Sequence, residues 1–340
     1  MRRRLWTTVA GVASVAALVA VPSAFAAYTT PKLEVVQTAT AVTVRASAGV
    51  SDDATARAQI FAPVGTQVIT TQAPGTVLGT VRAQVSALAL GGALLPLEGQ
   101  VVVAAPGQVP AATQAACTLG VTPTATWIMA LQAAGQTINL PVFVLPVAAT
   151  ETSLGAAKLV VCLAPPGVPA EQGGAVFGAK FLSAEFSVRG VFSRVASGVW
   201  IALWTPWTAN GPPVNAAGTV ASPAAIAAGA VTASARTAGR RVLVSGRVTQ
   251  GGQPRAGARV TIFGGNRRTG LRRLGQTTSR GNGTYSFRAR AGTFFRASAV
   301  ATPGSAAAIC TALQGQGLPL PCINPTVSGF TATSPVVRKR

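Results

Sequence analysis

Seven acidic residues and no histidine limit the chemistry that this chain could perform. Without histidine, the usual general base and the commonest transition-metal ligand are missing. A glycosidase would need two carboxylates from these seven acids, and we consider Asp52, Asp53 and Glu98. Asp52 and Asp53 are adjacent in a sequence typical of a turn, and no EF-hand spacing follows them. We therefore expect no enzymatic activity, no metal and no cofactor, and we keep a hydrolase built on these acids as a third hypothesis.

Arginine is the residue type whose distribution points to a partner. Residues 27–225 contain eight basic and seven acidic residues, whereas residues 226–340 contain sixteen arginines, one lysine and no acid. An uncompensated positive charge of this size either faces solvent or lies against a polyanion. The sequence leaves both interpretations open.

The arginines of this basic part alternate with apolar residues in three predicted strands. In RRVLVSGRV, the apolar residues Val242, Val244 and Val248 share one face. The arginines fall on the other face, and ARVTIFG and TYSFRARAG show the same alternation. A guanidinium can bind phosphate or carboxylate through two parallel hydrogen bonds. The residues predicted to bind a polyanion are Arg241, Arg247, Arg259, Arg288 and Arg290.

The expected partner of these arginines is an anionic cell-wall polymer or an acidic glycan. Nucleic acid is not expected, because the basic part contains neither a recognition helix nor an RNP-like motif. The chain is also expected outside the cell, where phosphate-bearing wall polymers and acidic glycans are the available polyanions.

Three tryptophans in SGVWIALWTPWTANGPP give a second hypothesis for binding. Trp200 and Trp204 fall on the same face of a predicted strand, and Trp207 follows Pro206. Such a group could stack on sugar rings, which would make this part a carbohydrate-binding module. Large aromatic side chains are more often buried, so the same residues also fit a hydrophobic core.

The beginning of the chain has the layout of a cleavable export signal over residues 1–26. Three arginines precede an apolar run from Leu5 to Val21, and Pro22 and the small-x-small triplet Ala24-Phe25-Ala26 follow. No later stretch is long and apolar enough to span a bilayer, so we expect no transmembrane segment after cleavage. The predicted location is secreted, extracellular or associated with the cell envelope, with an uncleaved anchor as the alternative.

Four cysteines form one pair in each half of the chain. In an oxidising compartment an even number of cysteines indicates disulfides. Three pairings are formally possible, and we favour Cys117 with Cys162 and Cys310 with Cys322. Zinc is a poor alternative because the chain lacks histidine and C-x-x-C spacing.

Short β-branched segments separated by proline and glycine predict an all-β fold, and helical periodicity of useful length is missing. We expect two β-sandwich domains, the first immunoglobulin-like and the second transthyretin-like. The small-residue stretch after Val214 suggests a linker. The predicted divisions are a β-sandwich of unknown function at 27–222, a linker at 223–230, a basic β-sandwich at 231–302 and a disulfide-tied C-terminal extension with a basic tail at 303–340.

The second domain resembles the carboxypeptidase regulatory-like, transthyretin-like β-sandwich family. The resemblance rests on Gly246 in the first strand, the P-x-A-G-A turn that begins at Pro254, and the R-G-N-G-T-Y-S-F hairpin at 280–287. It covers about 75 residues and implies a stalk, spacer or adhesion module without catalysis. The family pattern often has an aspartate before the N-G turn, where this chain has Ser279 and Arg280.

Overall fold

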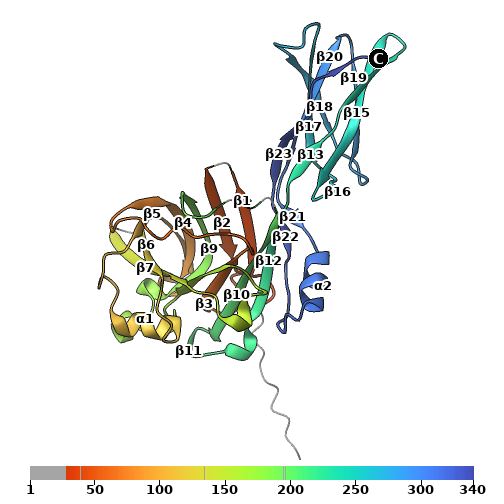
Figure 1. Ribbon diagram of the computed structural model, residues 1–340. Helices are drawn as coiled ribbons and strands as arrows, with labels where there is room; N and C mark the ends of the chain where they lie inside the picture. The colour runs from red at the N-terminus through yellow and green to blue at the C-terminus, as the bar shows by residue number, and fades with distance from the viewer. Residues whose placement is uncertain (1–27, 39, 134, 194, 196) are drawn as a thin grey trace, which may run out of the picture.

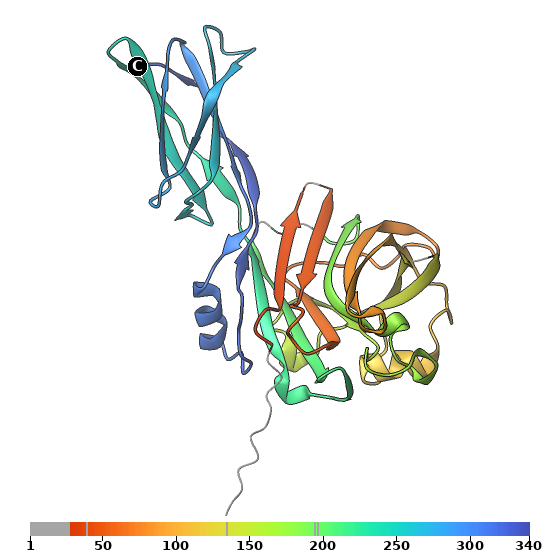
Figure 2. The same cartoon turned by 180° about the vertical axis from the view of Figure 1, so that it is seen from behind.

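The fold is all-β, as the sequence predicted. The computed structural model describes residues 28–340 apart from 39, 134, 194 and 196, so the expected export signal lies outside the described residues. The strands form one large sheet near the N-terminus and two smaller sheets in an elongated part beyond it (Figures 1 and 2). Because the apolar residues are short and mostly β-branched or small, pleated strands are the elements that pack them best.

Fourteen strands form the large sheet, which is continuous in the order β1-β2-β9-β4-β5-β6-β7-β8-β3-β10-β12-β22-β21, with β11 paired to β10. The sheet curls so that its first strand lies close to the last strands in this order. Thr326 Oγ1 of β22 donates a hydrogen bond to Leu33 O of β1 at 2.6 Å. The strands are β1 (Lys32–Gln37), β2 (Ala41–Ser47), β3 (Thr55–Ala62), β4 (Val77–Ala87), β5 (Ala93–Val103), β6 (Ala125–Ala133), β7 (Gln136–Leu145), β8 (Ala157–Cys162), β9 (Ala179–Arg189), β10 (Gly198–Thr208), β11 (Gly211–Val214), β12 (Val220–Ile226), β21 (Gly304–Ser305) and β22 (Thr326–Val327).

The inner face of this curled sheet encloses the larger hydrophobic core, which includes Trp127, Trp200 and Trp204. Residues 27–222 were expected to form a sandwich of the immunoglobulin type. Their strands do face one another across a core, but hydrogen bonds run unbroken from β1 to β21, so the layers belong to one sheet.

Two short helices cover the outer face of the large sheet, and both were missed by the sequence analysis. The helix α1 (Ala111–Thr118) lies over Phe143 and Val160, and α2 (Ala308–Gly315) lies over a cluster that includes Phe61. A helix of eight residues has marginal stability alone. Each is fastened by a disulfide of the predicted pairing, Cys117–Cys162 for α1 and Cys310–Cys322 for α2.

Two five-stranded sheets enclose a second core and form what we call the basic unit, residues 229–301 with 330–340. Tyr285 crosses the core over Gly246 and donates to Thr232 O at 2.6 Å. A side chain at Gly246 would collide with that carbonyl. One sheet contains β13 (Gly229–Val231), β14 (Ser234–Ala238), β15 (Arg241–Gln250), β16 (Gln253–Pro254) and β19 (Thr284–Ala289); the other contains β17 (Arg259–Gly265), β18 (Arg272–Thr278), β20 (Phe294–Ala301), β23 (Phe330–Thr333) and β24 (Val337–Arg338).

The expected hairpin at 280–287 is a turn that passes the chain between the two sheets. The strand before it, β18, pairs with β17, whereas the strand after it, β19, pairs with β15. Gly283 has a φ of 76° there and packs against Val248 O, so glycine is needed at this position. The turn chemistry was predicted correctly, but the pairing of the strands around it was wrong.

The linker predicted at 223–230 needs correction, because the first half of this segment belongs to strand β12 of the large sheet. Ala224 lies opposite Trp200 and Val220 opposite Trp204 in the pairing of β12 with β10. The small residues that suggested a flexible linker instead leave room for the large tryptophan rings. Only residues 227–228 separate β12 from β13.

The C-terminal residues 303–340 do not form an extension, which is a second correction to the predicted divisions. Strands β21 and β22 return to the large sheet, and β23 and β24 complete the basic unit. The chain therefore crosses between the two parts three times, at 227–228, 302–303 and 328–329.

Side chains of the basic unit hold all three crossings. Gln250 Nε2 donates to Ser328 O at 2.7 Å and to Ala227 O at 3.4 Å. Arg255 Nη2 donates to Thr302 O at 2.6 Å. Because buried and half-buried polar groups tie each crossing to the basic unit, we expect the basic unit to project from the large sheet in a fixed direction.

Candidate functional site

The structure brings four of the five predicted arginines to one sheet. Arg241 and Arg247 point outward from β15, and Arg288 and Arg290 lie on or just after the neighbouring strand β19. Arg259 lies on β17 in the opposite sheet, so it faces the other way. All five side chains are exposed.

The outer face of the β15 sheet has a regular arrangement of polar rows. Arg236 of β14 and Arg288 of β19 flank the half-buried Leu243 in one cross-strand row. The next row of the same face consists of serines from the same three strands. Arg236 was missed by the sequence analysis, although the alternation in SARTA before the Gly239 turn could have revealed its strand.

The opposite face also presents arginine, but there it is combined with an aromatic ring. Arg273 and Arg296 flank Phe263 in one cross-strand row of β18, β17 and β20. The Arg296 guanidinium carbon lies 5.3 Å from the centre of the Phe263 ring, which is the range of a cation–π interaction. Arg259 lies on this face, nearer to the large sheet.

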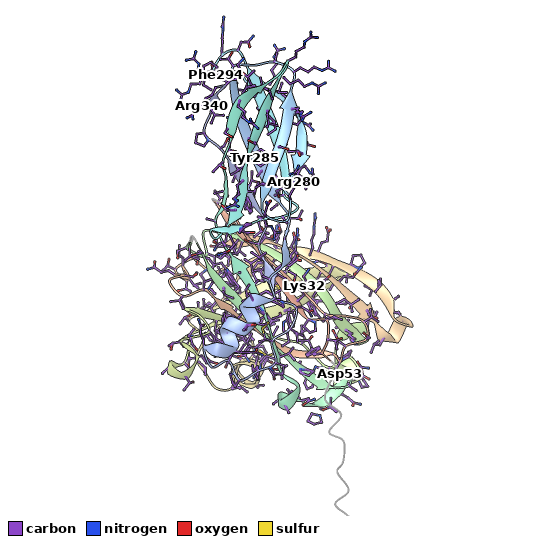
Figure 3. All side chains as sticks on the ribbon, turned by 90° about the vertical axis from the view of Figure 1, so that its right-hand side faces the viewer. Lys32, Asp53, Arg280, Tyr285, Phe294 and Arg340 are labelled. Carbon is purple, nitrogen blue, oxygen red and sulfur yellow. A yellow bond between two sulfur atoms is a disulfide. The ribbon has the colours of Figure 1, made fainter. Side chains whose placement is uncertain are left out.

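The densest positive charge lies at the free end of the basic unit, away from the large sheet (Figure 3). Three connections and the C-terminal tail converge there, and the backbone of the tail is fixed. Lys339 N donates to Thr293 O at 2.8 Å, and Thr237 N donates to Arg340 O at 3.0 Å. We call the basic residues of these segments the distal cap: Arg240, Arg241, Arg267, Arg268, Arg290, Arg338, Lys339 and Arg340.

No carboxylate side chain offsets this charge within the basic unit, since residues 226–340 contain no aspartate or glutamate. The four ion pairs found among the described residues all lie in the part before residue 190. Screening at physiological salt confines the influence of those distant acids to about 8 Å. The positive charge of the distal cap is therefore not neutralised by an acidic side chain of the basic unit.

The tryptophans that could have formed a glycan platform lie inside the large sheet. Trp200 and Trp204 are both 0% exposed, and the Trp204 indole donates to Ser222 Oγ at 2.7 Å. Trp207 is half-buried and its indole donates to Leu163 O at 3.2 Å. The strand places Trp200 and Trp204 on one face, as predicted, but that face is the core, so their rings cannot stack on a sugar.

Of the acids proposed for a hydrolase, Asp52 is engaged by hydrogen bonds within the chain and Glu98 pairs with Arg82. The buried Asp52 carboxylate accepts hydrogen bonds from Thr29 N, Thr30 Oγ1 and Gly49 N. Burial raises the pKa of this carboxyl, but the hydrogen bonds from Thr30, Thr29 and Gly49 outweigh it and hold the pKa below its ordinary value. Lys180 Nζ donates to the Asp52 backbone carbonyl. With a further hydrogen bond from Thr29 Oγ1, the Asp52 carboxylate accepts four hydrogen bonds within the chain and organises a loop.

Replacing Asp52 by asparagine should lower the free energy of unfolding by about 2 kcal/mol near neutral pH, because charge-assisted hydrogen bonds are lost. The lowered pKa means that the ionised form stabilises the fold above the ordinary value of about 3.9, and that this stability disappears as pH falls through the folded value. Urea denaturation from neutral to acid pH should show the gap between wild type and Asp52→Asn closing. The matched change Asp53→Asn should have little effect, and a gap that widens in acid would contradict this account.

No protein-family model matches this chain, and no curated protein matches it in sequence. Within the described residues, no helix is long and apolar enough to cross a membrane. Among those residues there is also no group of three or more acidic or cysteine side chains placed to hold a metal ion. The case for function therefore rests on the residues and geometry given above.

Proposed function

We propose that this chain is a non-enzymatic protein of the cell envelope or exterior that holds an anionic polymer with the distal cap of its basic unit. The observation that carries the proposal is the gathering of eight basic residues at one free end, in a unit without acidic residues. The positive side chains of the cap repel one another, and a bound polyanion would offset this repulsion.

The chemistry of the cap favours phosphate or carboxylate groups along a polymer. Seven of its eight basic residues are arginines, and a guanidinium pairs with either group through two parallel hydrogen bonds. The export signal expected at 1–26 supports a partner outside the cell, such as a phosphate-bearing wall polymer or an acidic glycan. The resemblance to carboxypeptidase regulatory-like domains supports the same role, because that family supplies adhesion and spacer modules.

The shape of the chain also supports this proposal. The basic unit extends away from the large sheet, and its outer end is open on several sides (Figures 1 and 3). Arg236, Arg288 and Arg273 continue the positive surface from the cap onto both outer faces. A polymer held at the cap could therefore run along either face of the unit.

Two variants with the same loss of charge test whether the cap is the site. One changes Arg240, Arg267 and Arg268 to glutamine at the free end, and the other changes Arg247, Arg259 and Arg280 to glutamine nearer to the large sheet. We expect the distal variant of the full chain to bind inorganic polyphosphate about 100-fold more weakly, at roughly 1 kcal/mol per basic side chain. The proximal variant should lose less than about tenfold. Equal losses in affinity would show that charge acts diffusely and would contradict a site at the cap.

A further inference from the structure

Five charged side chains of alternating sign form one row across the outer face of the large sheet. Each is the register partner of the next on the neighbouring strand, from β1 through β2, β9 and β4 to β5. This row does not involve the basic unit. We call it the charge ladder, and its members in spatial order are Glu34, Arg45, Glu185, Arg82 and Glu98.

The charge ladder lies along a hollow of about 520 Å³ in the surface of the sheet. Lys32 and small or polar side chains of the adjoining rows complete its lining, among them Ser47, Ser183 and Gln84. The Arg82 and Glu98 side chains are 75% and 71% exposed, so this end of the ladder is open to a ligand. The large sheet thus contains a hollow with a charged floor.

Opposite charges in the hollow balance one another. Lys32 Nζ lies 2.5 Å from Glu34 Oε1, Arg82 Nε lies 3.4 Å from Glu98 Oε1, and Arg45 pairs with Glu185. With three acids and three bases, the floor has no net charge to attract a charged polymer. Three of the seven acids in the chain are gathered here, although exposed ion pairs contribute little to stability.

The paired groups still have hydrogen-bonding capacity to offer. A carboxylate has about four acceptor positions and a guanidinium has five N–H donors, and one ion pair uses a minority of them. The ladder therefore presents acceptors and donors in alternation, one kind per strand, at the inter-strand spacing of about 4.8 Å. Hydroxyl groups both donate and accept, so a chain of hydroxyl-bearing rings matches this alternation, and one sugar ring is close to one strand spacing in length.

We propose that the charge ladder binds a segment of a neutral polysaccharide that lies across strands β1, β2, β9, β4 and β5. No aromatic side chain is among the residues that line the hollow in the described part of the chain, so binding rests on hydrogen bonds alone. The expected affinity for a short oligosaccharide is weak, with a Kd of about 1 mM. This site is independent of the distal cap, and it assigns a sugar ligand to a surface other than the tryptophans.

Calorimetric or NMR titration of the full chain with neutral hexasaccharides of glucose, mannose and xylose tests the proposal. We expect at least one of them to bind, and its Kd to change less than about twofold between low salt and 0.5 M salt, because the ligand is uncharged. Glu185→Gln should weaken that binding about tenfold, through loss of charge-assisted hydrogen bonds. Glu171→Gln, an exposed acid in a turn outside the hollow, is the matched control and should bind as wild type does.

Three results would overturn the proposal. The first is the absence of binding of all three hexasaccharides at about 10 mM. The second is equal sugar affinity of Glu185→Gln and wild type, which would leave the ladder as a set of structural ion pairs. The third is self-association of the chain that Glu185→Gln abolishes, which would make the hollow a contact between copies. None of these results depends on whether the distal cap binds a polyanion.

Discussion

Replacing Trp204 by alanine should lower the free energy of unfolding by about 4 kcal/mol, the largest loss we expect from a single substitution. The ring is 0% exposed and lies 6.1 Å from the ring of Phe181, measured between centres. Its removal leaves a cavity and also leaves the buried Ser222 hydroxyl without the indole donor. Urea denaturation followed by circular dichroism would measure the change.

Trp207→Ala is the matched control for this prediction, because its side chain is only half-buried and should cost about 1–2 kcal/mol. A Trp204→Ala protein as stable as wild type but deficient in sugar binding would contradict the core assignment. That result would restore the tryptophan platform that the sequence left open. Loss of stability in Trp204→Ala with sugar affinity unchanged agrees with the structure.

Removing either disulfide should release the helix that it fastens to the outer face of the large sheet. Replacing Cys117 and Cys162 by alanine opens a loop with a sequence separation of 45 and should cost about 4 kcal/mol, on the chain-entropy model. Replacing Cys310 and Cys322 by alanine opens a separation of 12 and should cost about 3 kcal/mol. Denaturant unfolding of both double variants would measure the two losses.

Which of the two variants loses more stability shows which effect of the disulfides is larger: the restriction of the unfolded chain, or the holding of a helix over apolar side chains of the sheet. If chain entropy dominates, the Cys117–Cys162 variant is the less stable one. If the cover over Phe61 and Ile201 matters more, the Cys310–Cys322 variant should be less stable and should bind a hydrophobic dye, because α2 would leave those side chains exposed. Stability unchanged in both variants would contradict the role assigned to the disulfides.

The pattern of strands β15, β17 and β19 of the basic unit could be predicted because each has one face in the core and the other toward water. Val242, Val244, Val260 and Ile262 point inward, as their alternation with arginine indicated. The large sheet was harder to predict because β10 is buried on both faces. Trp200 and Trp204 face the inner core while Ile201 and Leu203 face α2, so the sequence shows a continuous apolar run with no alternation.

The predicted domain boundaries were wrong where they were based on amino-acid composition, because composition does not show which strands pair. Alanine and proline around Pro223 suggested a linker, yet this strand needs small side chains beside the Trp200 and Trp204 rings. The return of residues 304–327 to the large sheet could not be predicted locally, because β21 and β22 are only two residues long. Thr326 of β22 pairs with Ala224 of β12, far earlier in the chain, and β21 joins the sheet through β22.

Arg241 and Arg290, two of the five arginines predicted to bind a polyanion, belong to the distal cap, and their role in binding stays a prediction. Outward arginines on β15 and β19 follow from the two-residue period of a strand. Arg240, Arg267 and Arg268 lie in turns without a periodic pattern, and they come together only because alternate connections of a two-sheet unit share one end. For the same reason, no local pattern reveals that Glu34, Glu185 and Glu98 lie in one row.

The measurement that tests the central claim most directly is the affinity of the full chain for inorganic polyphosphate over a salt series. We expect tight binding at low salt and a Kd that rises about 100-fold between roughly 0.05 and 0.5 M salt, because exposed charges are screened. An uncharged dextran should show no such dependence. Absence of polyphosphate binding at low salt, or a Kd that salt leaves unchanged, would contradict the proposal and would leave the arginines as a solvated surface.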